Sequence, residues 1–297
     1  MDASFIRGVI PALVTPMSDD EALDREGLVK LIDGTIDSGV HGVFTVGTAG
    51  EFWALSFEEK QRIYEWTVEA AGGRVPAYVG TSANSTEEAI ALSRAGQAAG
   101  ADCLSILTPS FTTPTQEELF NHYAEIATSV TLPILLYNLP ARTGNALEVE
   151  TVRRLVADYG NIVGIKDSSG DFSQALEYIN GMPDGFRFVM GRDTLIASGF
   201  EQGAVAAIAA TANVAPDVGA AIFDAHSEGD LPEARRHQIR LAPLRSLFTL
   251  GTHPAMLKTG ADLVGFAGGP PRRPAKRLSQ DQVEILRAVL VEMGKLS

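Results

Sequence analysis

Short apolar segments recur along the chain, and each is bounded by turn-forming or polar residues. They are rich in β-branched residues and show no alternation of polar and apolar positions, which predicts strands buried on both faces. Eight such segments can be identified, at residues 8–14, 43–46, 75–80, 103–107, 133–137, 161–167, 186–190 and 204–208.

Helix signals lie between these segments. Asp24 is a predicted N-cap, and Ser56 with Glu59 and Ser85 with Glu88 have the spacing of capping boxes. The predicted helices cover residues 25–38, 56–71, 85–100, 116–129 and 148–159, and a further helix begins near residue 191. Alternation of strands and helices implies parallel strands joined by helical crossovers, and eight repeats favour a closed α/β barrel, the TIM (β/α)8 barrel.

The C-terminal part of the sequence lacks strand signals. Helices are predicted at 231–250, 253–264 and 280–293. We therefore expect a barrel domain over residues 1–225, carrying the active site, and a C-terminal helical region over 226–297. The basic, proline-rich segment 268–274 is predicted to be a surface loop rather than a nucleic-acid-binding patch, because the chain is acidic.

Composition narrows the class of protein. The chain has 297 residues and a formal net charge of −13, which argues against nucleic acid or an anionic membrane surface as a partner. The single cysteine, Cys103, lies in an apolar run and is expected to be a buried structural thiol. Residues 1–7 do not form a signal peptide and no segment is apolar enough to span a membrane, so a cytoplasmic location is expected. The histidines lack metal-ligand spacing, and neither a metal nor another cofactor is expected.

Lys166 closes the predicted strand 161–167 and is the first candidate for chemistry. An amine at the rim of an apolar core is favoured in its neutral form, which is the form that attacks a carbonyl carbon to make a Schiff base. The plainer alternatives are a lysine that extends into solvent, or one paired with Asp167 or Asp171.

Other reactive side chains follow predicted strands, where the active sites of such barrels lie. They are Thr15, Thr48, Tyr137 and Arg142, with Ile208 at the end of the last strand. The turn Gly47–Glu51 presents backbone N–H groups that can hold a carboxylate or phosphate. Taken singly, each has a structural explanation. Tyr137 could be a core aromatic, Thr48 a turn residue, and Arg142 a helix cap or a partner of Glu148.

Four motifs occur together and in order: Gly47-Thr-Ala-Gly-Glu51, Tyr137-Asn-Leu-Pro-Ala-Arg-Thr-Gly144, Gly164-Ile-Lys-Asp167 and Thr211-Ala-Asn-Val214. With these motifs the chain resembles the dihydrodipicolinate synthase / N-acetylneuraminate lyase family over nearly its whole length. The resemblance implies a class I aldolase-type barrel with a C-terminal helical region. It also implies homotetramers built from dimers, with a 2-oxo acid and an aldehyde as substrates.

The resemblance assigns roles to single residues. Lys166 is expected to form the imine with pyruvate or a related 2-oxo acid, and Tyr137 to move protons at the bound substrate. Thr48 is expected to hydrogen-bond Tyr137, while the backbone of Thr48 and Ala49, after Gly47, holds the substrate carboxylate. Ile208 matches a residue that lines the pyruvate site. Arg142 matches the arginine that binds the second substrate's carboxylate in the synthases, and sialate lyases differ there.

Two positions depart from the synthase pattern. Phe111 stands where the synthases carry a tyrosine that reaches a neighbouring subunit's proton relay, and Ala49 replaces a second threonine. Arg142 and the 211–214 motif favour dihydrodipicolinate synthase-like chemistry, whereas Ala49 and Phe111 favour a 2-keto-3-deoxy sugar-acid aldolase or dehydratase. A paralogue that binds 2-oxo acids without turnover is a third interpretation.

Overall fold

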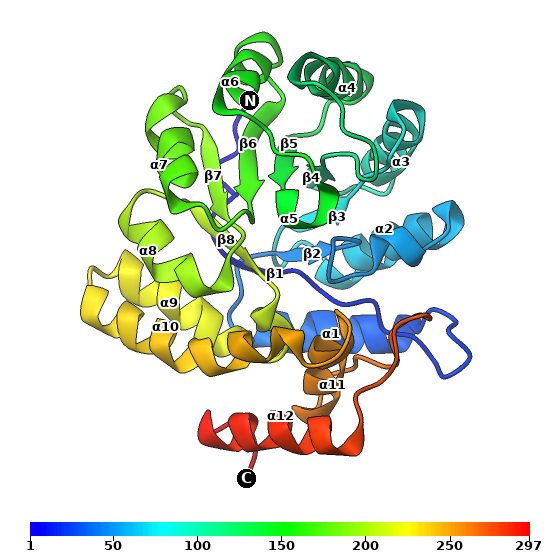
Figure 1. Ribbon diagram of the computed structural model, residues 1–297, viewed down its shortest axis with the longest axis vertical. Coiled ribbons are helices and arrows are strands. Elements are labelled where there is room, and N and C mark those ends of the chain that lie inside the picture. Colours follow the sequence, from blue (N-terminus) through cyan, green and yellow to red (C-terminus); the bar gives the residue numbers. More distant parts are fainter.

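The computed structural model describes residues 1–297 and contains one eight-stranded parallel sheet rolled into a barrel (Figure 1). The strands are β1 (Gly8–Pro11), β2 (Val43–Thr45), β3 (Ala77–Gly80), β4 (Cys103–Leu107), β5 (Ile134–Asn138), β6 (Ile162–Asp167), β7 (Arg187–Met190) and β8 (Ala206–Ala209). β1 pairs with β8, and a parallel bridge between Ala12 and Phe44 brings β1 to β2. The predicted (β/α)8 barrel is confirmed.

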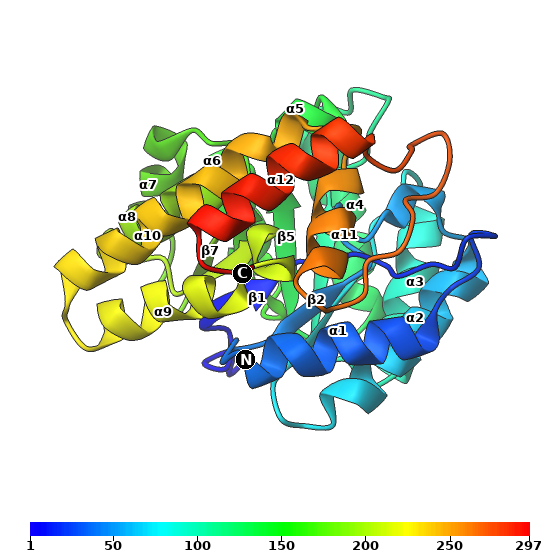
Figure 2. The same cartoon turned by 90° about the horizontal axis from the view of Figure 1, so that it is seen from below.

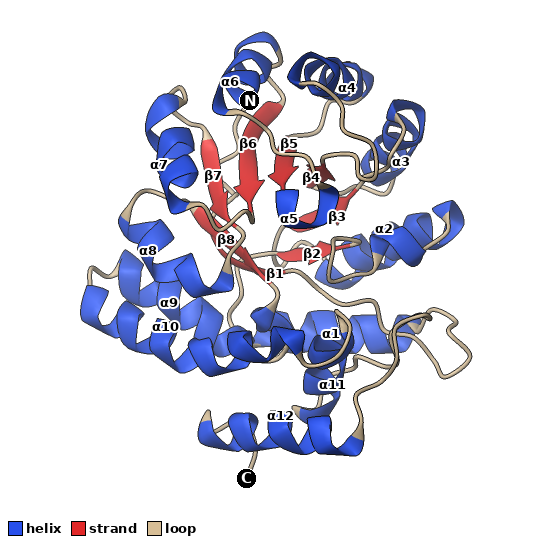
Figure 3. Ribbon diagram, in the orientation of Figure 1, coloured by secondary structure: helices blue, strands red, loops and turns tan.

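Helices surround the strands as an outer layer (Figure 3). They are α1 (Arg25–Asp37), α2 (Phe57–Ala71), α3 (Thr86–Ala98), α4 (Gln116–Ser129), α5 (Pro140–Thr143), α6 (Val149–Asp158), α7 (Phe172–Gly181), α8 (Ile196–Glu201) and α9 (Pro216–Ser227), with short 3-10 turns η1 (Phe52–Ala54), η2 (Asp193–Leu195) and η3 (Thr211–Asn213). Buried tyrosines fix this layer to the barrel. Tyr64 of α2 donates to Gly80 O at 2.7 Å, and Tyr123 of α4 donates to Ile106 O at 3.2 Å.

The C-terminal region forms α10 (Leu231–Ser246), η4 (Leu247–Thr249), α11 (Ala255–Leu263) and α12 (Gln280–Glu292). α12 packs across α10 and α11, as Figure 2 shows. The three helices predicted here are present with shorter bounds. The division of the chain at residue 225 remains a prediction.

Several local predictions differ from the structure. The capping box of Ser56 and Glu59 is present, but Ser85 only accepts from the Glu88 N–H, without the return bond. Helices α5, α7 and α9 were not predicted; α5 has only 4 residues, whereas α7 has 10 and begins after the N-cap Asp171. Strand β1 ends at Pro11, before the predicted run 8–14 does, since that run continues as buried loop, whereas β8 begins and ends later than the predicted run 204–208.

The segment 268–274 is a loop, as predicted, but only part of it lies at the surface, because Gly268 and Pro271 are buried. Arg272 lies half-buried and donates to both carboxylate oxygens of Glu59, at 2.7 and 2.8 Å. Its backbone N–H donates to Glu51 Oε2 at 2.8 Å. Arg273 and Pro274 match the predicted surface position, and 82% of the Arg273 side chain is exposed. Arg272 is thus hydrogen-bonded to two acidic side chains, Glu51 and Glu59.

Candidate active site

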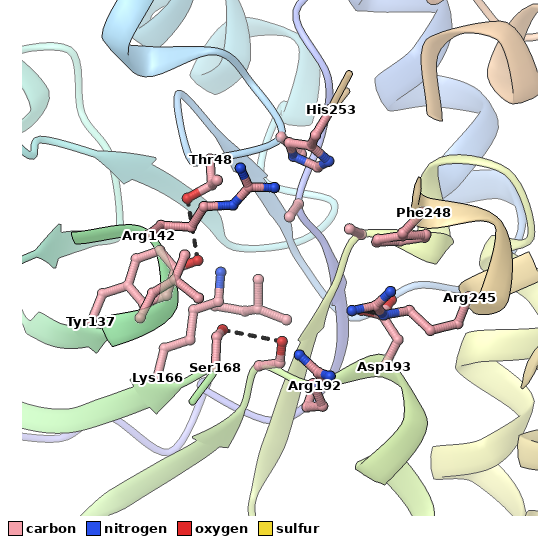
Figure 4. Close-up of a pocket in the computed structure, with 16 residues that line it drawn as sticks. Thr48, Tyr137, Arg142, Lys166, Ser168, Arg192, Asp193, Arg245, Phe248 and His253 are labelled. Carbon is pink, nitrogen blue, oxygen red and sulfur yellow. Dashed lines mark hydrogen bonds and ion pairs between the residues drawn. The ribbon is translucent and has the colours of Figure 1, made fainter. Parts of the chain in front are cut away.

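A cavity of about 120 Å³ opens at the carboxyl ends of the strands (Figure 4). It is lined by residues from the barrel loops and from the C-terminal region: Ala12, Thr48, Ala49, Tyr137, Leu139, Arg142, Lys166, Ser168, Gly191, Arg192, Asp193, Ile208, Ala210, Arg245, Phe248 and His253. Of the predicted candidates, Thr15 and Gly47 do not line it. A Cβ on Gly47 would lie 2.5 Å from the Phe44 ring, so this glycine permits close packing beneath the turn.

Lys166 lies on β6 with only 3% of its surface exposed. Its Nζ lies 3.9 Å from the centre of the Tyr137 ring and 5.1 Å from that of Phe44. The proposed partner Asp167 points elsewhere, accepting from Asn138 Nδ2 and Ser169 Oγ at 2.7 Å each. Lys166 forms no ion pair, so both the paired and the solvent-extended alternatives are wrong. The amine faces the cavity between two aromatic rings.

Tyr137 and Lys166 are register partners on the neighbouring strands β5 and β6. This pairing explains why their side chains lie side by side at the mouth of the barrel. Thr48 Oγ1 lies 3.3 Å from Tyr137 Oη, so the two hydroxyls form a hydrogen bond that links the β2 turn to β5. A phenol that is hydrogen-bonded to a second hydroxyl, with an amine over its ring, is placed to exchange protons with a substrate bound at that amine.

The turn that carries Thr48 and Ala49 is conformationally strained. Val46 has φ of 56° and Glu51 has φ of 58°, values that are unusual for residues with a side chain and costly for a β-branched one. Thr15 Oγ1 donates to Gly50 O at 2.7 Å, which attaches the turn to the chain after β1. Ala49 is buried, and its methyl group leaves room in the cavity where a threonine would place a hydroxyl.

A buried ion pair holds the end of this turn. Glu51 Oε1 lies 2.6 Å from Lys258 Nζ of α11, and the two side chains are 2% and 0% exposed. Lys258 also donates to Pro270 O at 2.6 Å. Burial lowers the pKa of Lys258, while the Glu51 carboxylate raises it. The C-terminal region therefore supports the turn through charge as well as packing.

Arg142 belongs to the one-turn helix α5, which begins at Pro140 and is ended by Gly144 at φ of 79°. Its side chain reaches into the cavity above Lys166 (Figure 4). Neither Glu148 nor any other carboxylate pairs with it, so the ion-paired alternative is wrong. This guanidinium is free to bind an anion.

The residues in β8 and directly after it have two different roles. Ile208 lines the cavity from β8 itself. Asn213 does not, because its side chain closes the barrel: Oδ1 accepts from Val14 N–H at 2.9 Å and Nδ2 donates to Ala12 O at 2.6 Å. Thr211 is held by Asp193, whose Oδ1 accepts its N–H and hydroxyl at 2.8 and 2.6 Å. The motif Thr211–Val214 thus serves closure of the barrel.

Among the cavity-lining residues that were not predicted from the sequence, five carry charged or aromatic side chains: Arg192, Asp193, Arg245, Phe248 and His253. Arg192 and Asp193 follow β7 directly, so the rule that found Lys166 could have found them. The other three come from the helical region that folds over the barrel mouth, and no local signal marks them. Burial, aided by Arg142 and Arg245, lowers the pKa of His253 to about 4, so this imidazole is neutral at pH 7.

The structure contains no group of three or more His, Cys, Asp or Glu side chains placed to hold a metal ion. Cys103 is buried in β4, and burial raises the pKa of its thiol, as expected for a structural cysteine. None of the helices combines the length and apolarity that a membrane-spanning helix needs.

A parallel barrel with a buried lysine beside a phenol at its mouth is the arrangement of a class I, Schiff-base-forming lyase. Comparison with known proteins is consistent with this class. The model of the dihydrodipicolinate synthetase family matches residues 5–293. A 4-hydroxy-tetrahydrodipicolinate synthase of Methanopyrus kandleri is 42% identical over 293 residues, which cover 98% of this chain and 97% of the relative.

Solved structures agree with the sequence comparison. A crystal structure of a dihydrodipicolinate synthase has a TM-score of 0.93 and 36% identity, covering 98% of this chain and 100% of its own. YagE, a prophage protein of the same family from E. coli K12 in complex with pyruvate, has a TM-score of 0.93 and 30% identity, covering 97% and 98%. The chain belongs to the dihydrodipicolinate synthetase family. It is an enzyme, a lyase or synthase of the class I, Schiff-base type, and the predicted resemblance is confirmed.

Proposed function

We propose that Lys166 binds pyruvate, or a related 2-oxo acid, as an imine, and that the resulting enamine adds to an aldehyde as in a 4-hydroxy-tetrahydrodipicolinate synthase. The observation that carries this proposal is the position of the Lys166 amine, buried and unpaired, 3.9 Å from the centre of the Tyr137 ring. Aspartate semialdehyde is the aldehyde with which we propose to test it.

The chemistry follows from the groups present. The neutral amine attacks the keto carbon, and the carbonyl oxygen takes up protons and leaves as water to give the imine. The imine nitrogen withdraws electrons, so the neighbouring methyl group loses a proton and becomes the enamine. Attack of this carbon on the aldehyde forms the new carbon–carbon bond, and water then releases the product from Lys166. Tyr137, backed by Thr48, is the group within reach that can exchange these protons.

The anionic ends of the substrates need separate partners. We propose that the backbone N–H groups of Thr48 and Ala49 hold the carboxylate of the 2-oxo acid, and that Ile208 packs against its apolar side. Arg142 lies on the same cavity without a carboxylate partner and is suited to the carboxylate of the aldehyde. A guanidinium bound to a carboxylate through charged hydrogen bonds contributes about 1.5–3 kcal/mol.

A 2-keto-3-deoxy sugar-acid aldolase or dehydratase is the second candidate. Ala49 and Phe111 favour it, because both lack the hydroxyl groups that the synthases use. Assays of pyruvate with aspartate semialdehyde, run against cleavage or dehydration of a panel of 2-keto-3-deoxy acids, separate the two. Absence of turnover with the semialdehyde would remove the synthase proposal. Membership of an enzyme family argues against the third interpretation, a non-catalytic paralogue.

We also propose that the chain assembles as a homotetramer, a dimer of dimers, and acts in the cytoplasm. Phe111 supports an interface near the site, since 98% of its surface is exposed at φ of 76°. Trp53, 54% exposed, lies beside a second hollow that reaches Thr48 and Arg142. Light scattering after size-exclusion chromatography would measure the mass, and four times the mass of one chain is expected. A monomer at micromolar concentration would contradict the proposal.

A further inference from the structure

The wall of the cavity remote from Arg142 carries two more guanidinium groups. Figure 4 shows Arg142 on one side of the Lys166 amine and Arg192 and Arg245 on the other. Arg192 follows β7 and lies against Gly170, whose hypothetical Cβ would be 3.5 Å from the arginine Nε. Arg245 comes from α10 and lies over the Phe248 ring, with its Cζ 4.1 Å from the ring centre. Both residues are partly buried.

These positive groups are poorly compensated. Arg142 and Arg192 have no carboxylate partner, and Arg245 has only Asp193, whose Oδ2 is 3.9 Å from its Nε. The other Asp193 oxygen is already bound twice by Thr211. Burial lowers the pKa of Arg245, Asp193 raises it, and Arg192 lowers it again because the two guanidinium groups repel each other. Three arginines and one carboxylate thus face a single cavity in a chain of net charge −13.

Without a bound anion, such a cluster of guanidinium groups raises the free energy of the folded protein. Like charges held near each other in a half-buried site repel, and Arg245 Nε is buried without a hydrogen-bond acceptor. The surrounding acidic chain does not attract an anion from a distance, so any attraction has to come from local donors. His253, neutral at pH 7, lies on the Arg142 side of the cavity (Figure 4) and adds a polar group there without adding charge.

We propose that Arg192 and Arg245 form an oxyanion subsite that binds a carboxylate or phosphate at the end of the substrate farthest from the imine carbon. This inference rests on the proposed function, because the imine on Lys166 fixes the end of the substrate that faces the barrel. The subsite narrows the substrate class to aldehydes with an anionic group at the remote end; for an aldehyde with a single carboxylate, such as aspartate semialdehyde, Arg142 and the pair Arg192 and Arg245 are competing partners of that carboxylate.

The test compares aldehydes that differ at the remote end. Pyruvate is condensed with two matched pairs of aldehydes, and kcat/KM is measured for each aldehyde. The first pair is glyceraldehyde and glyceraldehyde 3-phosphate, and the second is butanal and succinic semialdehyde; the second member of each pair is the anionic one. The subsite predicts that at least one anionic aldehyde is preferred over its neutral counterpart, and the preferred pair identifies phosphate or carboxylate. Arg192→Gln and Arg245→Gln should each reduce this preference about 10- to 100-fold. Arg192→Lys and Arg245→Lys should retain part of it, since a point charge remains.

Arg235→Gln is the matched control, because Arg235 lies on the same helix as Arg245, is 68% exposed and contacts only Glu201 at the surface. It should leave the preference unchanged. An equal rate with neutral and anionic aldehydes, or a preference that disappears only in Arg142→Gln, would overturn the inference.

Two further measurements keep this result separate from the proposed function. Borohydride trapping of pyruvate should succeed equally in all these variants, because none removes Lys166. If trapping fails in the unmodified protein, the proposed function fails. Calorimetric titration with inorganic phosphate needs no imine and tests the subsite alone. Binding that is weakened at least 10-fold by Arg192→Gln supports it, and binding that both arginine variants leave unchanged refutes it.

Discussion

Replacing Lys258 by methionine tests how the C-terminal region supports the turn Gly47–Glu51, which carries Thr48. Methionine keeps most of the side-chain length and volume but removes the amine that lies 2.6 Å from Glu51 Oε1. Glu51 would then be a buried carboxylate with one remaining donor, the Arg272 N–H at 2.8 Å. Removing one partner of a buried ion pair costs about 3–5 kcal/mol, because the other charge stays buried without compensation. We expect Lys258→Met to lower the free energy of unfolding by this amount.

The double variant Glu51→Gln/Lys258→Met separates two contributions to the loss of stability in Lys258→Met: the unpaired buried carboxylate of Glu51 and the lost packing of the lysine side chain. The new glutamine side chain would still accept from the Arg272 N–H, and its amide could donate to Pro270 O, so no charge is left buried. We expect the double variant to cost less than about 2 kcal/mol, which makes the coupling between the two sites strongly favourable. Lys276→Met is the control, because Lys276 is exposed and unpaired, and its effect should lie within about 0.5 kcal/mol.

Urea unfolding followed by circular dichroism, at one fixed protein concentration, measures these differences. A loss below about 1 kcal/mol in Lys258→Met would refute the reasoning, as would a double variant that is less stable than the single one. The variant should also lose activity while it still folds, because Glu51 ends the turn that places Thr48 against Tyr137. Pyruvate trapping at Lys166 should then be slower rather than absent.

Substitutions at the site and a pH series test the remaining expectations. Tyr137→Phe should lower kcat about 100- to 10,000-fold, since it removes the phenol that exchanges protons, while borohydride still attaches pyruvate slowly to Lys166. Arg142→Gln should raise KM for aspartate semialdehyde about 10- to 100-fold and leave KM for pyruvate nearly unchanged, as steady-state kinetics would show. Burial lowers the pKa values of His122 and His253 from 6.5 to about 4, so the unfolded chain takes up these two protons at a higher pH than the folded chain does. The free energy of unfolding, measured with urea, should therefore fall as the pH drops from about 6.5 to about 4. Replacing both histidines by Gln should make the free energy of unfolding less dependent on pH in this range.

The barrel could be predicted because parallel strands buried on both faces leave continuous apolar runs in the sequence. The strand register, which places Tyr137 beside Lys166, could not be predicted from these runs, because they do not alternate and the pairing of β5 with β6 shifts between Ile134 and Leu135. Helices α7 and α9 were not predicted although their start signals are present: Asp171 is an N-cap of the same type as Asp24, and Pro216 stands at the first helical position. Element type was therefore easier to predict than element bounds.

The residues of the candidate site likewise fall into those that the sequence could locate and those that it could not. Lys166, Tyr137, Thr48 and Arg142 lie at or after strand ends, where the topology of the barrel gathers them. Arg245 and His253 line the same cavity from the C-terminal region, far from Tyr137 along the chain. Helix periodicity says which face of α10 is apolar but not where α10 packs, so no sequence pattern could place these two residues at the barrel mouth.

The central claim is that the Lys166 amine forms an imine with a 2-oxo acid. Incubation with pyruvate and sodium borohydride, followed by peptide mass mapping, tests it most directly. The expected result is one reduced pyruvate adduct per chain, located on Lys166, and none in Lys166→Ala. Absence of any adduct with pyruvate and related 2-oxo acids, or an adduct on a different lysine such as Lys258, would contradict the account.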